Sequence, residues 1–541
     1  MKKSIRKLVA VVLACLMAAA LLAACGNNGG SSPAPSASSQ APSAGSPDPG
    51  ASSPAQTGGG GASASDRVLN VGVFQDPGSL HPLAATGAGG FLNVARAYMD
   101  APFDNLPDGS LEMVLVESIE TVSDINYKLH LRRGVTFSNG SDFRANDFMF
   151  SMELSRAHPQ HMLNVKAIDF EKSKIEDEYT VDLWLTQYDI GNWPGMCLLY
   201  IFDEETYDEA DFALNPVGTG PYVVTDYVVN SHVTMEAREG FWGGEVAIKK
   251  IRFQILNEES QRVNALVTGD VDKTRIPLKD IDYVESLGGY DVTNVSAAMA
   301  TCAYFNISPD GVLGTLEARL AVMYAIDRQS IADLAFYGMT KPTTWVVSDE
   351  AVDYEPRFSY FDVYTNGQNL EKAKQYAEQS GLVGKTVRIT SNGELMHNTT
   401  AEIIQNNLNA IGVNSTITIF DQATYFGNVL MNNENFDMGL LFVSCPPKFA
   451  IDMLTMYPTF IDLGWEGKDY DDYVAMGRRG MSMTDDKARG DVIADMLKIF
   501  EKYHPWFTFV EMYNPRAVSK DLGGVEFYGD GSIKFKYWYW K

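Results

Sequence analysis

Residues 26–65 consist almost wholly of Gly, Ser, Ala, Pro, Gln and Thr, and this composition decides where a folded body can begin. The stretch has no aromatic residue and no hydrophobic periodicity, so it has nothing with which to build a core. A chain of this kind behaves as a flexible tether. The folded body is therefore expected to start near Asp66 or Arg67.

The residues before this tether have the order of an export signal. Four basic residues within the first seven positions precede an apolar run over 8–22. The run ends in Leu-Ala-Ala-Cys25, which resembles the lipobox of bacterial lipoproteins, where the cysteine is acylated and becomes the new N-terminus. About 15 apolar residues are fewer than the roughly 20 that a transmembrane anchor, the alternative, would need. The sequence predicts a signal peptide over 1–24 and a lipid on Cys25.

The body is long and acidic. Its length is too great for one core and suggests two or three lobes. The formal net charge of the chain is −26 at pH 7, and loss of the basic signal makes the remainder more acidic still. This charge argues against binding nucleic acid or anionic lipid headgroups. Beyond the signal region only Cys197, Cys302 and Cys445 remain, without a CxxC motif, so at most one intrachain disulfide and no metal site are expected.

Hydrophobic periodicity predicts a mixture of strands and helices. Alternating apolar residues indicate strands at 69–73, 127–131 and 251–255. Helical spacing starts at Leu316, and Gly338 stands where that helix could end. From 387 onward the order is strand, helix closed by Gly412, strand, helix and apolar strand at 436–443. That alternation implies a parallel sheet in an α/β lobe.

Two short motifs have local interpretations. Gly218-Thr219-Gly220-Pro221 predicts a tight turn in which the glycines are free to take positive φ. A phosphate-binding loop would need a lysine and a helix start, and the sequence has neither at that point. Asp327 and Arg328 are expected to form a surface or interlobe ion pair.

Four segments carry a family resemblance. They read DPGSLHP at 76–82; LHLRRGVTFSNG at 129–140 with ANDF at 145–148; NPVGTGPY at 215–222 with FW at 241–242; and YFN at 304–306 with AIDR at 325–328. In these segments the chain resembles the family 5 extracellular solute-binding proteins of ABC importers, a group that includes oligopeptide, dipeptide and nickel binders. The similarity runs from Val68 to about Asn514.

The resemblance implies an α/β fold of the periplasmic-binding-protein type, in its type II, large family 5 form. Mixed sheets flanked by helices would build two lobes, with an extra subdomain on the first and a ligand cleft between them. The expected division is a first lobe over 67–300, a second over 301–510 and a C-terminal segment over 511–541 that returns to the first lobe, preceded by the signal peptide and a lipidated tether over 25–66.

The resemblance also implies a role and partners. The chain would capture a peptide or related small solute by lobe closure and deliver it to an ABC permease with a cytoplasmic ATPase. It would be a monomer without cofactor or metal, anchored by its lipid on the extracellular face, or in a periplasm where an outer membrane exists. A lipoprotein that presents its ligand to a receptor without import is the alternative. An extracellular hydrolase is less favoured, because no GxSxG or HExxH motif is present.

Candidate ligand contacts follow from position on the matched segments, with core packing or a turn as the alternative for each. Peptide-binding relatives place a tryptophan and an aspartate just after the strand that matches 436–443, and neither is found there, so peptide amine recognition would need another carboxylate such as Asp452. The candidates are Gln75, Asp76, Trp193, Tyr304, Asn306, Trp345, Phe442, Ser444 and Cys445.

Overall fold

The computed structural model describes residues 67–84, 88–106, 110–158, 161–421, 424–430, 432–433, 435–444, 449–527 and 533–541. These residues belong to one compact unit, Ala64–Lys541. The predicted signal peptide, Cys25 and the tether lie outside the described residues, as does Cys445. None of the helices in the described ranges is both long enough and apolar enough to cross a bilayer.

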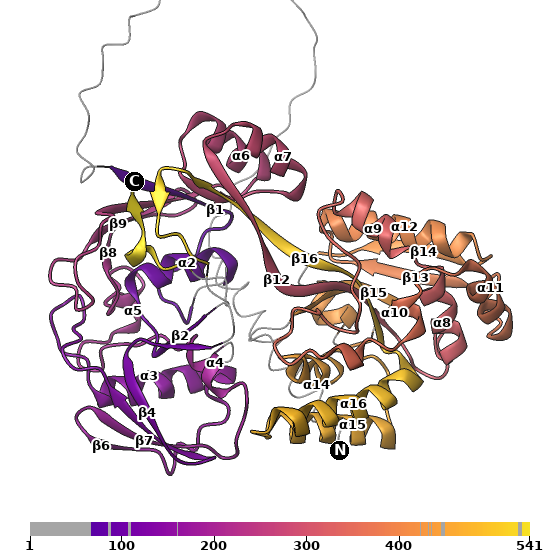
Figure 1. Ribbon diagram of the computed structural model, residues 1–541, viewed down its shortest axis with the longest axis horizontal. Helices are drawn as coiled ribbons and strands as arrows, with labels where there is room; N and C mark the ends of the chain where they lie inside the picture. The colour runs from indigo at the N-terminus through magenta and orange to yellow at the C-terminus, as the bar shows by residue number, and fades with distance from the viewer. Residues whose placement is uncertain are drawn as a thin grey trace, which may run out of the picture. The chain divides into compact units, whose positions relative to one another are not determined.

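A ten-stranded sheet runs through the unit (Figure 1). Its strands, in spatial order, are β14 (Asn414–Ile419), β13 (Thr386–Ser391), β15 (Met438–Ser444), β12 (Tyr290–Phe305), β16 (Trp506–Ser519), β11 (Lys273–Arg275), β1 (Val68–Val73), β10 (Lys250–Ile255), β9 (His232–Ala237) and β8 (Tyr222–Val228). The predicted strands at 69–73 and 251–255 are confirmed as β1 and β10, which pair in parallel.

Both ends of this sheet contain a parallel group. β1 lies between β10 and β11 and is parallel to both. At the other end β13 is parallel to β14 and β15. Helix α6 (Glu259–Thr268) follows β10, and α12 (Leu395–Asn409) connects β13 to β14. The predicted alternation and the α/β class with mixed sheets are therefore confirmed.

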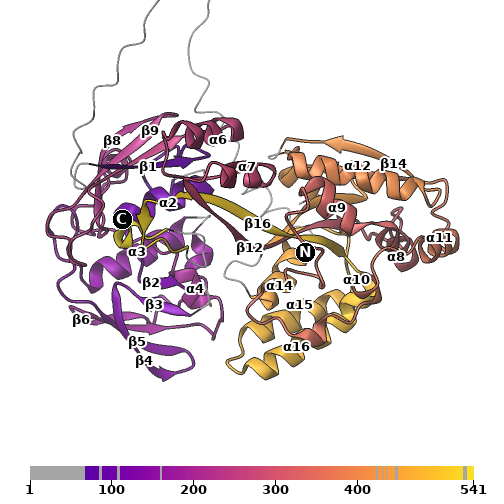
Figure 2. The same cartoon turned by 45° about the horizontal axis from the view of Figure 1, so that its top comes forward.

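Two long strands join the two groups. β12 and β16 pair antiparallel from Tyr290 with Ser519 to Tyr304 with Trp506. β16 also pairs with β11 of the first group, and β12 pairs with β15 of the second. The two strands run side by side between the groups in both views (Figure 1, Figure 2). Any motion of one group against the other must bend or twist this ribbon.

A second sheet of four antiparallel strands stands apart from the large one. In spatial order it consists of β4 (Val116–Ser123), β5 (Asn126–Leu131), β7 (Thr180–Trp184) and β6 (Lys174–Asp177). The predicted strand at 127–131 is confirmed as β5. Two small pairs complete the strands: β2 (Phe103–Asn105) with β3 (Leu111–Met113), and β17 (Leu522–Gly523) with β18 (Tyr539–Trp540).

The other helices cover the sheets. In the amino-terminal half they are α2 (Ala88–Tyr98), α3 (Ala145–Ala157), α4 (Asn192–Met196), α5 (Glu209–Phe212) and α7 (Ile281–Ser286). In the carboxyl-terminal half they are α8 (Leu316–Ala325), α9 (Arg328–Ala335), α10 (Asp362–Thr365), α11 (Leu370–Gln379), α14 (Ala450–Phe460), α15 (Lys468–Met481) and α16 (Asp486–Tyr503).

Separate hydrophobic cores divide the described residues. The largest is built almost entirely from side chains between Ala300 and Val510. A second lies around β1, β9 and β10 and includes Phe535 and Trp538 from the C-terminal segment. A third supports the four-stranded sheet, and a fourth lies under α6 and α7. Because burial of apolar side chains is the main stabilising term, each core can hold its own group together.

The predicted helix from Leu316 toward Gly338 is two helices. α8 ends at Ala325, and the side chain of Asp327 accepts hydrogen bonds from the amides of Gln329 and Ser330, which starts α9. The expected Asp327–Arg328 ion pair is wrong. Arg328 is buried and donates to the carbonyl oxygens of Thr343, Val363 and Tyr364, because buried donors need acceptors.

The glycines of the 218–221 motif serve a different purpose from the predicted one. Neither glycine has a positive φ. Instead, the backbone of Tyr98 in α2 lies directly against them, and the Gly220 amide donates to the Tyr98 carbonyl at 3.0 Å. A β-carbon on Gly218 would lie 2.1 Å from that carbonyl oxygen, and one on Gly220 would lie 2.5 Å from the carbonyl carbon. The motif lets a loop pack backbone to backbone on a helix.

Replacing Gly220 by alanine is expected to destabilise the first group by about 1–3 kcal/mol, the usual range for overpacking. The added methyl group meets the Tyr98 backbone, which cannot rotate away as a side chain can. Gly289→Ala is the matched control, because its β-carbon would have open space. Chemical denaturation measures both variants. Equal midpoints for G220A and G289A would contradict the close-approach explanation.

Candidate functional site

A cavity of about 340 Å³ lies where the two parallel groups meet β16. From the first group it is lined by Phe74, which follows β1, by residues of α6 and by residues 275–279 at the end of β11. From the second it is lined by residues 335–337, which include the last residue of α9, and by Glu394, Leu395 and Met396 at the start of α12. In α/β sheets, ligands bind in the crevice at the carboxyl ends of parallel strands. This cavity adjoins those ends in both groups, and its volume suits a small solute.

Arg275 is the most distinctive side chain of the cavity. Its guanidinium carbon lies 5.6 Å from the ring centroid of Phe74, which is within cation–π range. Burial lowers its pKa, and the nearby charge of Arg262 lowers it further, while Glu394 and Glu259 act in the opposite direction. Arginine stays protonated despite such shifts. The cavity therefore holds a partly desolvated positive charge.

Arg262, on α6, has a structural task instead. It is buried, and it donates to the carbonyl oxygens of Leu256, Asn257 and Arg275 at 2.9, 2.8 and 3.1 Å. These bonds fasten the start of α6 to the end of β11. Burial lowers the pKa of Arg262, but its hydrogen bonds to carbonyl oxygens compensate the lost hydration. Arg262 thus holds the backbone that presents Arg275.

The opposite wall is largely apolar. Tyr337 is 46% exposed and Leu395 is 67% exposed, and both line the cavity. Met396 from α12 and Met512 from β16 extend the same wall. Exposed apolar surface beside a concavity is typical of a binding site. The arrangement offers one charged corner and one apolar side.

Gln75 and Asp76 lie one and two residues beyond the wall residue Phe74 in sequence. Gln75 is exposed. Asp76 accepts hydrogen bonds from the amides of Gly78 and Asn230 and, at 2.6 Å, from the hydroxyl of Tyr227. Asp76 therefore lies in a turn, which was the alternative to a ligand contact in the sequence analysis. Both of its carboxylate oxygens already accept hydrogen bonds within the protein.

Tyr304 and Trp345 are completely buried, which is the core packing that the sequence left open as the alternative for both. Tyr304 stacks on Tyr457 with ring centroids 5.5 Å apart and contacts Trp506. Trp345 stacks on Phe358 at 5.2 Å. The physical reason is that large aromatic side chains fill the core of the second group. A ligand would have to displace these neighbours to reach either ring.

The other candidates are spread over the structure. Trp193 packs edge-on against Phe103 and Tyr127 in the core of the four-stranded sheet. Asn306 donates to the carbonyl oxygen of Phe436, near the amino end of β15. Phe442 packs against the large core, and Ser444 ends β15. β15 is parallel to β13. Ser444, at the carboxyl end of β15, and the start of α12, which follows the carboxyl end of β13, therefore lie toward the same edge of the sheet.

Asp452 lies in the first turn of α14 and is not part of the cavity wall. Burial raises its pKa, with Lys166 acting to lower it and Asp189 to raise it. Lys166 itself lies 3.3 Å from Asp189. Asp452 is therefore part of a charge group shared with the first half of the chain.

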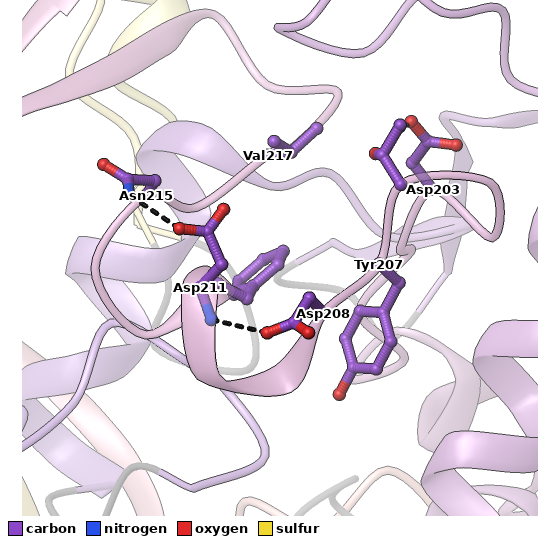
Figure 3. Close-up of a pocket in the computed structure, with 8 residues that line it drawn as sticks. Asp203, Tyr207, Asp208, Asp211, Asn215 and Val217 are labelled. Atoms are coloured by element: carbon purple, nitrogen blue, oxygen red, sulfur yellow. Dashed lines mark hydrogen bonds between the residues drawn. The ribbon is translucent and has the colours of Figure 1, made fainter.

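A smaller hollow of about 20 Å³ lies around α5 and contains three aspartates (Figure 3). Asp208 caps α5 by accepting from the Asp211 amide at 2.9 Å, and Asp211 accepts from Asn215 at 2.9 Å. Asp203 accepts from Thr206 and Ser141 at 2.7 Å. The volume is close to that of a single water molecule. These carboxylates stabilise local turns and leave no room for a solute.

Within the described ranges, no group of three or more His, Cys, Asp or Glu side chains is arranged to hold a metal ion. His504, His161 and His81 all have lowered pKa values, chiefly because they are buried. The neutral form of each ring is therefore favoured at neutral pH.

Sequence reasoning missed the cavity wall. The strand at 251–255 was predicted, but the residues that follow the strands were considered only after β1 and β15. Applying the strand-end rule to every parallel strand would have led to α6 and to the first turn of α12. Arg275 had no such signal, because β11 has only three residues and too short a run to show periodicity.

Comparisons with known proteins agree with this architecture. The family model for bacterial extracellular solute-binding proteins, family 5 middle, matches residues 110–447, more than half of the chain. Heme-binding protein A of Haemophilus influenzae is 26% identical over 308 residues, which cover 50% of this chain and 54%, about half, of that protein. The nickel-binding protein NikA of Staphylococcus aureus is 22% identical over 375 residues, or 68% of this chain and 72% of that one. In fold, the chain is similar to the ABC transporter substrate binding protein CtaP from Listeria monocytogenes, with a TM-score of 0.76, 20% identity and coverage of 88% of this chain and 99% of that one.

Proposed function

The chain belongs to the bacterial extracellular solute-binding proteins of family 5, and on this premise we propose that it is the binding component of an ABC importer. It captures a peptide or related small solute and delivers it to a membrane permease that works with a cytoplasmic ATPase. The observation that carries the proposal is the cavity at the strand ends, which both parallel groups and β16 line together. Relatives named for heme and for nickel indicate that the family alone does not fix the solute.

Closure of the two groups over the solute is the proposed mechanism. The groups have separate cores and are connected by β12 and β16. A solute that contacts both walls binds the closed arrangement better than the open one, so it shifts the population toward closure. A permease that recognises only the closed arrangement then receives loaded protein. The proposed lobes are 67–300 and 301–510, with 511–541 returning to the first.

The proposal includes a lipid anchor and a monomer. Acylation of Cys25 after removal of 1–24 would hold the body at the membrane, and the tether over 25–66 would let it reach its permease. Anchoring raises the effective concentration of the binder near its partner. Gln75 and Ser444 stay proposed ligand contacts, because Gln75 follows the wall residue Phe74 and Ser444 is the last residue of β15.

Ligand binding is tested first by thermal shift of the purified chain against short peptides, amino acids, sugars, heme and Ni²⁺ chelates. A solute present at about 100 times its dissociation constant is expected to add roughly 2.7 kcal/mol to the free energy of unfolding. A shift confined to one solute class identifies the cargo. Absence of any shift across all classes at millimolar concentration would count against solute capture.

Import is separated from sensing by uptake of the labelled ligand into cells. Loss of uptake when the chain is deleted, and its return when the chain is restored, supports import. Unchanged uptake together with tight binding in vitro would overturn import and favour the alternative of a sensor that presents its ligand to a receptor.

A further inference from the structure

Residues 186–190, between β7 and α4, reach from the four-stranded sheet to the carboxyl-terminal half. The amide of Ile190 donates to the carbonyl oxygen of Met481 at 2.9 Å. Met481 is the last residue of α15, and the final carbonyl groups of a helix have no partner within it. The turn from α15 to α16 points toward the amino-terminal half in both views (Figure 1, Figure 2). The two halves of the chain therefore also meet outside the β12–β16 ribbon.

The side chain of Ile190 makes this contact largely apolar. It is 9% exposed and belongs to the largest core, in which every other buried member among the described residues lies between 300 and 510. Tyr188 is partly buried against the same core. The core of the four-stranded sheet contains Leu185 and Met196, on either side in sequence, but not Ile190. This isoleucine has left the core of its sequence neighbours and has packed into the opposite half.

Buried charges lie beside the apolar contact. Asp189 is 6% exposed, accepts from the amide of Gly191 at 2.8 Å and lies 3.3 Å from the amine of Lys166. Burial raises the pKa of Asp452 in α14, and the charges of Lys166 and Asp189 across the contact affect that pKa as well. Lys166 is therefore within electrostatic range of one carboxylate from each half. The burial of groups from both halves shows that the contact excludes water.

Separation of the two halves would break this contact. Ile190 would leave the core and meet water, and its amide would lose the carbonyl oxygen of Met481. Burial of an isoleucine side chain corresponds to roughly a 10–100-fold change in an equilibrium constant. The β12–β16 ribbon is hydrogen-bonded along its own length and does not depend on this contact. The ribbon connects the halves, whereas the contact at Ile190 favours one arrangement of them.

We propose that residues 186–190 are a latch through which the four-stranded sheet holds the two halves closed. The inference rests on closure as the proposed mechanism and gives the four-stranded sheet a task in it. None of these five residues lines the cavity, so the latch acts on the equilibrium between arrangements and not on the solute. Its strength changes the affinity for every solute by the same factor, because a solute binds only the competent fraction of the protein.

The variant Ile190→Asp tests the latch on the purified full chain without any solute. Hydrogen exchange followed by mass spectrometry is expected to show about 10–100-fold faster exchange in peptides that cover 186–191 and 476–483, because exchange reports the opening equilibrium. Small-angle scattering should show a larger radius of gyration. Ile175→Asp is the matched control, since it makes the same change at a 46% exposed isoleucine of β6 in the same sheet.

Peptides from the separate cores distinguish a latch from a general loss of stability. In Ile190→Asp, peptides of β1 and α8 should exchange as they do in the wild type, because each half keeps its own core. Exchange that is faster by the same factor in those peptides would overturn the latch, and so would unchanged exchange at 186–191. Should the aspartate variant fail to fold, Ile190→Ala makes the same comparison, with the same direction and a smaller factor.

Binding assays separate the latch from the proposed function. For each solute that the thermal-shift screen identifies, Ile190→Asp should weaken binding about 10–100-fold and leave the order of preference among solutes unchanged. An altered order would mean that Ile190 contacts the solute, which overturns the inference and leaves solute capture standing. Failure of every solute to bind counts against the proposed function, whereas exchange and scattering still decide the latch.

Discussion

Asp104→Asn is expected to lower the free energy of unfolding by about 3–5 kcal/mol, the usual cost of removing one partner from a buried ion pair. Asp104 in β2 is almost completely buried and pairs with Lys534 from the C-terminal segment; Arg96 of α2 lies 3.9 Å away. All three side chains are buried. The amide would leave two cations without their shared carboxylate in a region from which water is excluded.

The pH dependence of this site has a definite sign. Burial alone would raise the pKa of Asp104, but Lys534 and Arg96 together outweigh burial and hold that pKa below its ordinary value. A lowered folded-state pKa means that the stabilisation is present above about pH 4 and is lost as the pH falls through the folded pKa. The difference between wild type and Asp104→Asn should therefore shrink in acid.

Calorimetry of the wild type and two variants checks this prediction. Asp521→Asn is the control, because Asp521 makes a 3.0 Å ion pair with Arg67 at the exposed surface, where such pairs contribute about 0–1 kcal/mol. The transition that melts the first-half cores should move far more for D104N than for D521N. Shifts of the same size in both would show that the buried pair contributes no more than a surface one.

Most of the architecture was predictable because its signals are local. Alternating apolar residues mark β1, β5 and β10, and the order of strands and helices after β13 implies the parallel pairing that β13, β14 and β15 have. The break between α8 and α9 was missed because helical spacing continues through it. Asp327 is identified as the N-cap of α9 by the hydrogen bonds that its side chain accepts from the amides of Gln329 and Ser330, and these bonds are seen only in the structure.

The site was less predictable, because it is assembled from distant segments. Position on a strand placed Gln75 one residue from a true wall residue, Phe74. The same reasoning could not tell that Trp345 is a core residue, since aromatic side chains suit a core and a ligand wall equally well. The role of Gly220 was also not predictable, because its backbone packs against that of Tyr98, which is far away in sequence.

The second large effect is expected at Glu511 on β16, where Glu511→Gln should stabilise the protein at pH 8 by a few kcal/mol. The carboxyl group is completely buried and accepts from the hydroxyl of Ser348 at 2.7 Å and from the amide of Asp349 at 3.0 Å. Burial raises the pKa of Glu511 to about 9, and the neighbouring carboxylate of Asp349 raises it as well. Lys341 lies 3.5 Å from Asp349, so its positive charge pairs with the carboxylate of Asp349 and not with Glu511.

The sign follows from proton counting. In the unfolded chain Glu511 loses its proton near pH 4.5, while in the folded chain it keeps it to about pH 9. The folded state therefore binds more protons over this window, and the free energy of unfolding falls by up to about 1.4 kcal/mol per pH unit as the pH rises. Glutamine resembles the protonated acid: its oxygen can accept from the Asp349 amide and its NH₂ group can donate to the hydroxyl of Ser348. Because it has no proton to lose, its contribution to stability does not change with pH.

Denaturant unfolding at pH 5, 6.5 and 8 measures this difference. E511Q and wild type should have similar stabilities at pH 5 and should diverge steadily toward pH 8. Glu350→Gln is the control, because Glu350 lies 3.7 Å from the same Lys341 but is 41% exposed, so its removal should change little at any pH. A wild type whose stability relative to E511Q is constant over pH 5–8 would mean that Glu511 is already ionised in the folded protein. The strand that joins the two groups would then contain a buried negative charge, and E511Q would be expected to alter solute-driven closure as well as stability.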